Sequence, residues 1–180
     1  MLDKNKTFLK NVVRQAVEAA VKNEKFTPTP TNEPELLARR GCFVTLKTFG
    51  QLRGCMGVFI ANKPLIDMAV EMAYSSSQYD PRFEDQRITA GELKDLDIEI
   101  SVLSELKKTG DPLSLELGKH GIYITKGRQS GCFLPQVATE TGWTKEEFLS
   151  YCCMHKAGLR PNAWKEPNTE VYLFTAEIIE

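Results

Sequence analysis

Residues 42–59 read CFVTLKTFGQLRGCMGVF. The segments CFVTLK and LRGCMGVF are rich in apolar and β-branched residues, and TFGQ between them contains a glycine. Two strand-like segments around such a turn predict a β-hairpin. Its second strand contains LRGCMG, where a cysteine stands between two glycines and two residues after an arginine. The hairpin therefore decides both the kind of sheet and the place of the first candidate site.

Helical and strand-like patterns alternate over the rest of the chain. Apolar residues paired every four positions between Phe8 and Val21 predict an amphipathic helix, so we assign residues 1–26 to an N-terminal helix, 27–34 to a Thr/Pro linker and 35–180 to the body. Further helices are predicted at 65–73 and 144–158, and further strands at 97–103, 121–125, 131–135 and 170–178. Hairpins interleaved with helices predict an α+β fold with a mainly antiparallel sheet.

Two parts of the sequence are similar to each other. GCFVT is followed by RGC, and GIYIT is followed by SGC, so a strand, a turn and a Gly-Cys pair twice precede a helical segment. Two interpretations stay open, a chance similarity of short windows and a domain built from two repeated lobes.

Length and composition predict an ordinary globular protein. The chain has 180 residues, which is typical of one domain, with 42% hydrophobic and 26% charged residues. A net charge of -1 lacks the basic excess that is typical of a dedicated nucleic-acid binder. No stretch of 18 apolar residues occurs, and the N-terminus MLDKNKTFLK lacks the apolar core of a signal peptide. We therefore expect a cytoplasmic protein without a membrane segment.

The five cysteines fit free thiols in a reducing compartment better than a disulfide framework. They form no C-x-x-C pair and no iron–sulfur signature, and the chain has only two histidines. We therefore expect neither a metal site nor a cofactor.

Arg53 and Cys55 are the first candidate catalytic residues. Alternation along a strand places them on one face, ~6 to 7 Å apart. At that distance a cation favours a thiolate by about 0.6 kcal/mol in water and about 2.5 kcal/mol at an effective dielectric of 20. We interpret Cys55 as a nucleophile, Arg53 as its cationic partner, and Gly54 and Gly57 as ligand-binding positions that leave the strand uncovered. The structural alternative is a buried cysteine beside a β-bulge.

Four further residues have both a structural and a functional interpretation. His120, in GKHGI, is either a turn residue or a catalytic base. Asp80 and Arg82, in DPRF, form an Asx-type turn, whose arginine could also bind an anion. Glu99 points away from the apolar face of its strand, toward solvent or a ligand.

Six segments, in order, closely resemble the AMMECR domain, which in bacteria is called protein A of the AmmeMemoRadiSam system. They are GCFVTLKTFGQLRGCMG, YDPRF, DLDIEISVL, GKHGIYI, SGCFLPQVATETGW and KAGLRPNAW. The resemblance extends from residue 8 to the C-terminus and implies an α+β domain with the LRGC motif at a cleft. It also implies a Memo-like metal-dependent protein and a radical S-adenosylmethionine protein as partners, but no particular reaction.

Two functional hypotheses follow from the residues and the resemblance together. The first is a cysteine-dependent enzyme of transferase or hydrolase type with Cys55 as nucleophile, Arg53 as its partner and His120 as base. The second is a non-catalytic adaptor that recognises a protein, nucleotide or RNA ligand through the same cleft, with Arg53 binding a carboxylate or phosphate.

Overall fold

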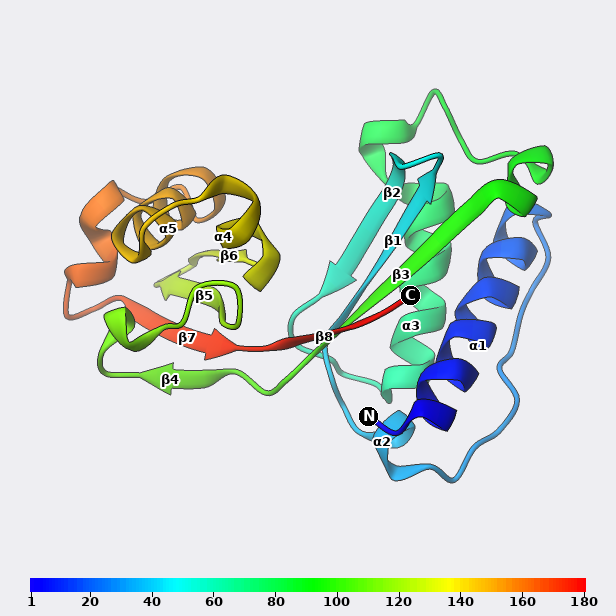
Figure 1. The fold of residues 1–180 in the computed structure, drawn as a ribbon, viewed down its shortest axis with the longest axis horizontal. Coiled ribbons are helices and arrows are strands. Elements are labelled where there is room, and N and C mark those ends of the chain that lie inside the picture. The colour runs from blue at the N-terminus through cyan, green and yellow to red at the C-terminus, as the bar shows by residue number, and fades with distance from the viewer. The chain divides into compact units, whose positions relative to one another are not determined.

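Two four-stranded sheets carry the fold, with strand orders β2-β1-β3-β8 and β4-β7-β5-β6 (Figure 1). The computed structural model describes all of residues 1–180. The chain divides into two compact units, unit 1 with residues 1–103 and 177–180, and unit 2 with residues 104–176. Helices combined with antiparallel strand pairs confirm the predicted α+β class.

Unit 1 contains the N-terminal helices, the first hairpin and the last strand. Its elements are α1 (Asp3–Val21), α2 (Pro34–Leu37), β1 (Cys42–Thr48), β2 (Gln51–Val58), α3 (Leu65–Tyr74), the π-helix η1 (Ser75–Tyr79), the 3-10 helices η2 (Pro81–Phe83) and η3 (Ala90–Asp95), β3 (Leu96–Leu103) and β8 (Ala176–Ile179). The N-terminal helix thus ends at Val21, earlier than the sequence predicts.

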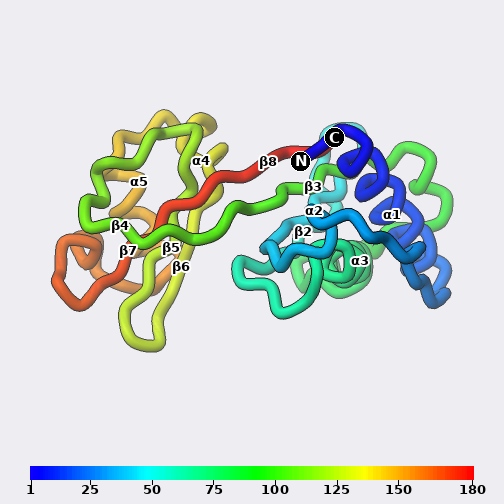
Figure 2. The backbone as a smooth tube through the Cα atoms, turned by 90° about the horizontal axis from the view of Figure 1, so that it is seen from below, coloured from blue at the N-terminus to red at the C-terminus, as the bar shows by residue number.

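The core of unit 1 lies between its sheet and the helices α1 and α3. Alternate residues of β1 (Cys42, Val44 and Leu46) are buried together with the apolar faces of α1 and α3. Both helices lie along the sheet in Figure 1. The opposite face of β1 is only partly covered, since Thr45 and Lys47 are half-buried. The chain ends meet in this unit (Figure 2), where the N-terminal ammonium donates to Glu177.

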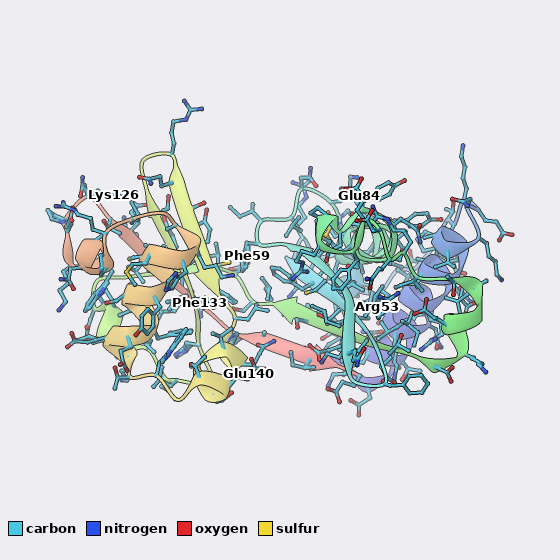
Figure 3. All side chains as sticks on the ribbon, turned by 90° about the horizontal axis from the view of Figure 1, so that it is seen from above. Arg53, Phe59, Glu84, Lys126, Phe133 and Glu140 are labelled. Carbon is cyan, nitrogen blue, oxygen red and sulfur yellow. The ribbon has the colours of Figure 1, made fainter.

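Unit 2 contains the second hairpin. Its elements are β4 (Lys107–Thr109), the 3-10 helix η4 (Pro112–Ser114), β5 (Gly121–Lys126), β6 (Gln129–Phe133), α4 (Pro135–Thr141), α5 (Lys145–Tyr151), the π-helix η5 (Cys152–Lys156), the 3-10 helix η6 (Pro161–Lys165) and β7 (Glu170–Phe174). Its core joins Ile122 and Ile124 of β5 to Phe133 and Phe148, whose rings stack. Phe133 is labelled in Figure 3.

The two units repeat one topology, which agrees with the second of the two interpretations of the internal sequence similarity, a domain built from two repeated lobes. In each, a hairpin (β1–β2 or β5–β6) leads through helices and a π-helix to a strand that pairs with the first hairpin strand. The fourth strand of each sheet is exchanged, because β4 follows β3 in the chain but pairs with β7, while β8 follows β7 but is the neighbour of β3.

Three local features differ from the prediction. The last predicted strand is two strands, β7 and β8, which belong to different sheets and are separated at Thr175. Strand β4 and helix α4 lie in segments where the sequence predicts no element. Among the helices, none has both the length and the apolar character needed to cross a lipid bilayer.

Candidate functional site

The candidate site is centred on Cys55 in β2. Thr45 of β1 pairs with Cys55 on one side and with Glu99 of β3 on the other, so the three side chains follow one another across the partly covered face. Cys55 is half-buried, and its Sγ lies 3.2 Å from Thr45 Oγ1. A hydroxyl at this distance can donate a hydrogen bond to a thiolate.

The backbone of Cys55 is held at the edge of the sheet by Asp80 and Arg82. The Cys55 N–H donates to Asp80 Oδ2 (2.9 Å), and Arg82 Nη2 donates to the Cys55 carbonyl oxygen (3.0 Å). Arg82 also donates to the Asp80 carboxylate through Nε (3.0 Å) and Nη2 (2.6 Å). The Asp80 side chain is 1% exposed and that of Arg82 is 53% exposed. Asp80 is thus a buried anchor, whereas Arg82 is open to solvent beside the cysteine.

The electrostatics of this cluster follow from the contacts. The hydrogen bond from Arg82 is the main cause that lowers the pKa of Asp80 to about 2, and the backbone N–H groups of Cys55 and Arg82 add to the effect. The same hydrogen bond raises the pKa of Arg82, to which the charge of the Cys55 thiolate makes a smaller contribution. Arg82 is therefore a permanent cation within electrostatic reach of the Cys55 sulfur.

Ser76 of η1 is inserted between β1 and β2, next to Cys55. Its hydroxyl accepts from the Met56 N–H (2.9 Å) and donates to the Val44 carbonyl oxygen (2.8 Å), although Val44 and Met56 are cross-strand partners. The Ser76 side chain is buried. A π-helix places a backbone irregularity where a regular helix would continue, a feature often found at functional sites. Ser76 is not predictable from the sequence, because nothing local to SSSQ indicates a partner 20 residues away.

Substituting Ser76→Ala is expected to lower the free energy of unfolding by about 2 kcal/mol, because a buried N–H and a buried carbonyl lose their partner. Urea denaturation followed by far-UV circular dichroism measures the change. Ser77→Ala is the matched control, since the Ser77 hydroxyl donates only to carbonyls of its own helical segment, Ala73 and Tyr74. A loss no larger than that of the control would contradict the bridging role of Ser76.

The two glycines of LRGCMG approach the protein's own atoms. A β-carbon on Gly54 would lie 2.0 Å from the Ser76 carbonyl oxygen, and one on Gly57 would lie 2.2 Å from the Phe43 ring. We expected the space beside these glycines to admit a ligand, but η1 occupies it at Gly54 and β1 occupies it at Gly57. Both glycines position Cys55 through packing.

Arg53 does not accompany Cys55. The pairing of β1 with β2 shifts between Leu46 and Lys47, which face Gly54 and Leu52, and this leaves Arg53 as the extra residue of a bulge. Its guanidinium donates to Glu92 (3.0 Å from Nε) and to the Gln86 carbonyl oxygen. Figure 3 labels Arg53 on this strand. The cation beside the thiol is Arg82, and the bulge is the physical reason why simple alternation misplaced Arg53.

Glu99 lies on the same sheet face but in a separate depression. It accepts a hydrogen bond from Lys47 Nζ (3.3 Å) and lines a cavity of about 360 Å³ with charged residues that include Lys10, Arg14 and Asp97. Cys55 does not line this cavity. Glu99 does point away from the apolar face, as its strand pattern predicted.

His120 belongs to unit 2, whereas Cys55 belongs to unit 1. The Glu116 N–H donates to His120 Nδ1 (3.0 Å), so Nδ1 carries no proton and the ring offers its Nε2–H as a donor. A general base needs a free acceptor nitrogen, which this tautomer lacks. The hydrogen bonding of His120 therefore gives no support to the predicted role as base.

The other four cysteines are poor nucleophiles. Burial raises the pKa of Cys42 to about 12 and that of Cys132 to about 11, and it also raises the pKa values of Cys152 and Cys153. A raised thiol pKa lowers the thiolate fraction, which is the reactive form.

The fold and the site define a two-unit α+β protein with a half-buried thiol on an edge strand. An aspartate and an arginine bind the backbone of the cysteine that carries this thiol. Residues 10–179 match the AMMECR1 family model. The chain therefore belongs to the AMMECR1 family, as the sequence motifs indicated.

Relatives cover nearly the whole chain. A protein of Methanothermobacter thermautotrophicus is 42% identical over 183 residues, which cover 98% of this chain and 93% of that protein. Protein MK0488 of Methanopyrus kandleri is 40% identical over 96% of this chain and 86% of its own length. The crystal structure of uncharacterized protein PH0010 from Pyrococcus horikoshii is similar with a TM-score of 0.88, at 36% sequence identity over 99% of this chain and 92% of that one.

Proposed function

We propose that the protein is a cysteine-dependent enzyme of transferase or hydrolase type, with Cys55 as nucleophile and Arg82 as the group that binds the anionic part of the substrate. The observation that carries the proposal is the half-exposed Arg82 guanidinium, which the buried Asp80 fixes beside half-buried Cys55 and which donates to the Cys55 carbonyl oxygen. The Memo-like and radical S-adenosylmethionine proteins implied by the family resemblance remain proposed partners.

Each group has a definite part in the proposed step. The Cys55 thiol gives its proton to solvent, and its sulfur forms a bond to an electrophilic carbon of the substrate while the leaving group departs with the bonding electron pair and takes up a proton. Attack by water or by an acceptor on that carbon then restores the thiolate. The Thr45 hydroxyl, 3.2 Å from the sulfur, and the Arg82 guanidinium are the groups that stabilise negative charge on the sulfur during this step.

Alkylation of the native protein tests this proposal. With iodoacetamide at pH 7 and peptide mass spectrometry, Cys55 is expected to react faster than the same thiol in the urea-denatured chain, and about 100-fold faster than buried Cys42. Arg82→Gln is expected to slow alkylation of Cys55 about fivefold, because the thiolate loses the guanidinium that is bound to the Cys55 carbonyl oxygen.

Arg53→Gln is the matched control, since Arg53 is on the same strand and bonds to Glu92 instead. It is expected to leave the alkylation rate of Cys55 within about twofold. The nucleophile proposal fails if native Cys55 reacts no faster than the denatured thiol. If Arg82→Gln then still abolished co-purification with a Memo-like partner, the adaptor hypothesis would replace it.

A further inference from the structure

Unit 2 contains a cavity of about 350 Å³ that the proposed function does not use. Leu173 and Phe174 of β7 form its apolar side, and its polar lining residues are Ser104, Lys107, Lys108, Thr109, His120 and Thr175. No aspartate or glutamate lines it. A concave surface with an apolar side and a few polar groups is typical of a small-molecule site, and its volume is within the usual range.

The His120 side chain is held rigidly at this cavity. Its backbone N–H donates to the Glu116 carbonyl oxygen (2.9 Å), and the Glu116 N–H donates back to Nδ1 (3.0 Å). This reciprocal pair fixes the ring and its tautomer, so Nε2–H is the polar group that the neutral ring can offer to a ligand. A fixed donor is suited to recognition because little conformational entropy of the side chain is lost when a ligand binds.

Lys107 supplies the positive charge. On the edge strand β4 it pairs with Leu173, and no carboxylate lies within salt-bridge distance of its ammonium. The neighbouring Lys108 also lines the cavity, but its ammonium forms an ion pair with Glu170, which also accepts from the Tyr172 hydroxyl. The charge of Lys108 is thus neutralised, whereas that of Lys107 is not.

The hydroxyl groups complete the count of donors. Ser104 Oγ accepts from the Thr175 N–H and donates to the Glu105 carbonyl, and Thr109 Oγ1 donates to the Asp111 carbonyl, so both hydroxyls are engaged within the protein. With Lys108 paired to Glu170, the cavity offers one unpaired positive charge, the imidazole donor of His120 and the Thr175 hydroxyl, which match a singly charged carboxylate better than a doubly charged phosphate.

We propose that this cavity binds a small organic monocarboxylate, with its carboxylate between Lys107 Nζ and His120 Nε2–H and its apolar part against Leu173 and Phe174. The inference is independent of the chemistry at Cys55, because every residue it uses belongs to unit 2.

Histidine NMR tests the proposal directly. The chain has only two histidines, His120 and His155, so the imidazole carbon–proton spectrum of the full-length protein contains one reporter and one internal reference. Titration with benzoate is expected to shift the His120 resonances saturably and to leave those of His155 unchanged. Acetate, which lacks the ring, and inorganic phosphate are each expected to bind at least about tenfold more weakly than benzoate.

Two lysine variants provide the matched comparison. Lys107→Gln is expected to weaken benzoate binding about tenfold, while Lys165→Gln, in unit 2 but outside the cavity and ion-paired with Glu146, is expected to change it less than about twofold. Both lysines are exposed, so both variants should fold. Absence of a saturable shift, tighter binding of phosphate than of benzoate, or equal effects of the two substitutions would each overturn the proposal.

Discussion

The substitution Gly54→Ala is expected to lower the free energy of unfolding by at least about 3 kcal/mol. The added β-carbon would lie 2.0 Å from the Ser76 carbonyl oxygen, which is backbone and cannot rotate away as the end of a side chain could. Either η1 or β2 must move, and Ser76 would then lose its bridge between Val44 and Met56. The position where the sequence suggested room for a ligand is thus one of the least tolerant in the chain.

Equilibrium urea denaturation of the full-length protein measures this effect. Far-UV circular dichroism is the appropriate signal, since both tryptophans, Trp143 and Trp164, belong to unit 2. Gly110→Ala is the control, because a β-carbon there would meet no atom within 4 Å, and its effect should stay below about 0.5 kcal/mol. Equal stability of the two variants would mean that η1 does not rest on Gly54 as described.

Replacement of Asp80 by asparagine is expected to cost about 3 kcal/mol of stability at pH 7. The buried carboxylate accepts from the Cys55 N–H and from the guanidinium and N–H of Arg82. An amide removes the charge that holds Arg82 and replaces one acceptor oxygen with a donor. This expected loss of stability is at the lower end of the range for breaking a buried ion pair, because Arg82 is 53% exposed and water can solvate it.

The pH dependence of stability provides an independent measurement. The pKa of Asp80 is about 2 in the folded protein and 3.8 ordinarily, so its folded pKa is depressed. The carboxylate therefore contributes its stability in full above about pH 4, and this contribution, about 2 kcal/mol, is lost as the pH falls toward 2. In Asp80→Asn that part of the acid-induced loss should disappear.

A surface carboxylate is the control for Asp80. Glu71→Gln removes the exposed ion pair with Lys63, and the expected change is below about 0.5 kcal/mol. The account of the Asp80–Arg82 anchor fails if Asp80→Asn is as stable as Glu71→Gln, or if its unfolding between pH 4 and 2 follows that of the unmodified protein.

The sequence was a good guide to features that depend on neighbouring residues. Apolar residues spaced like a helix predicted α1, which forms at Asp3–Val21, and alternating residues predicted β3 at Leu96–Leu103. The helix predicted to begin at residue 144 starts there with a capping box of Thr144 and Glu147, a signal contained within four residues. Each of these patterns works over a few residues, so the chain reveals it without knowledge of its partners.

The partners of Cys55 could be predicted only in part. Asp80 and Arg82 were recognised as a turn with a possible anion-binding arginine, but their hydrogen bonds to the Cys55 backbone join residues 25 and 27 positions apart. Arg53 was assigned by strict alternation, which the bulge in β2 interrupts. A bulge depends on the register of the neighbouring strand, and a single strand's sequence does not contain that register.

By itself, the sequence determined the α+β class, the two hairpins, the family and the strand on which Cys55 lies, because local periodicity and turn residues act over short distances. Only the tertiary structure decided which cation accompanies the thiol, what fills the space beside Gly54, and that the run EVYLFTAEI is divided at Thr175 between two sheets. These outcomes depend on hydrogen bonds and close contacts between segments far apart in the chain. Several partners could satisfy the same local pattern, and packing selects one of them.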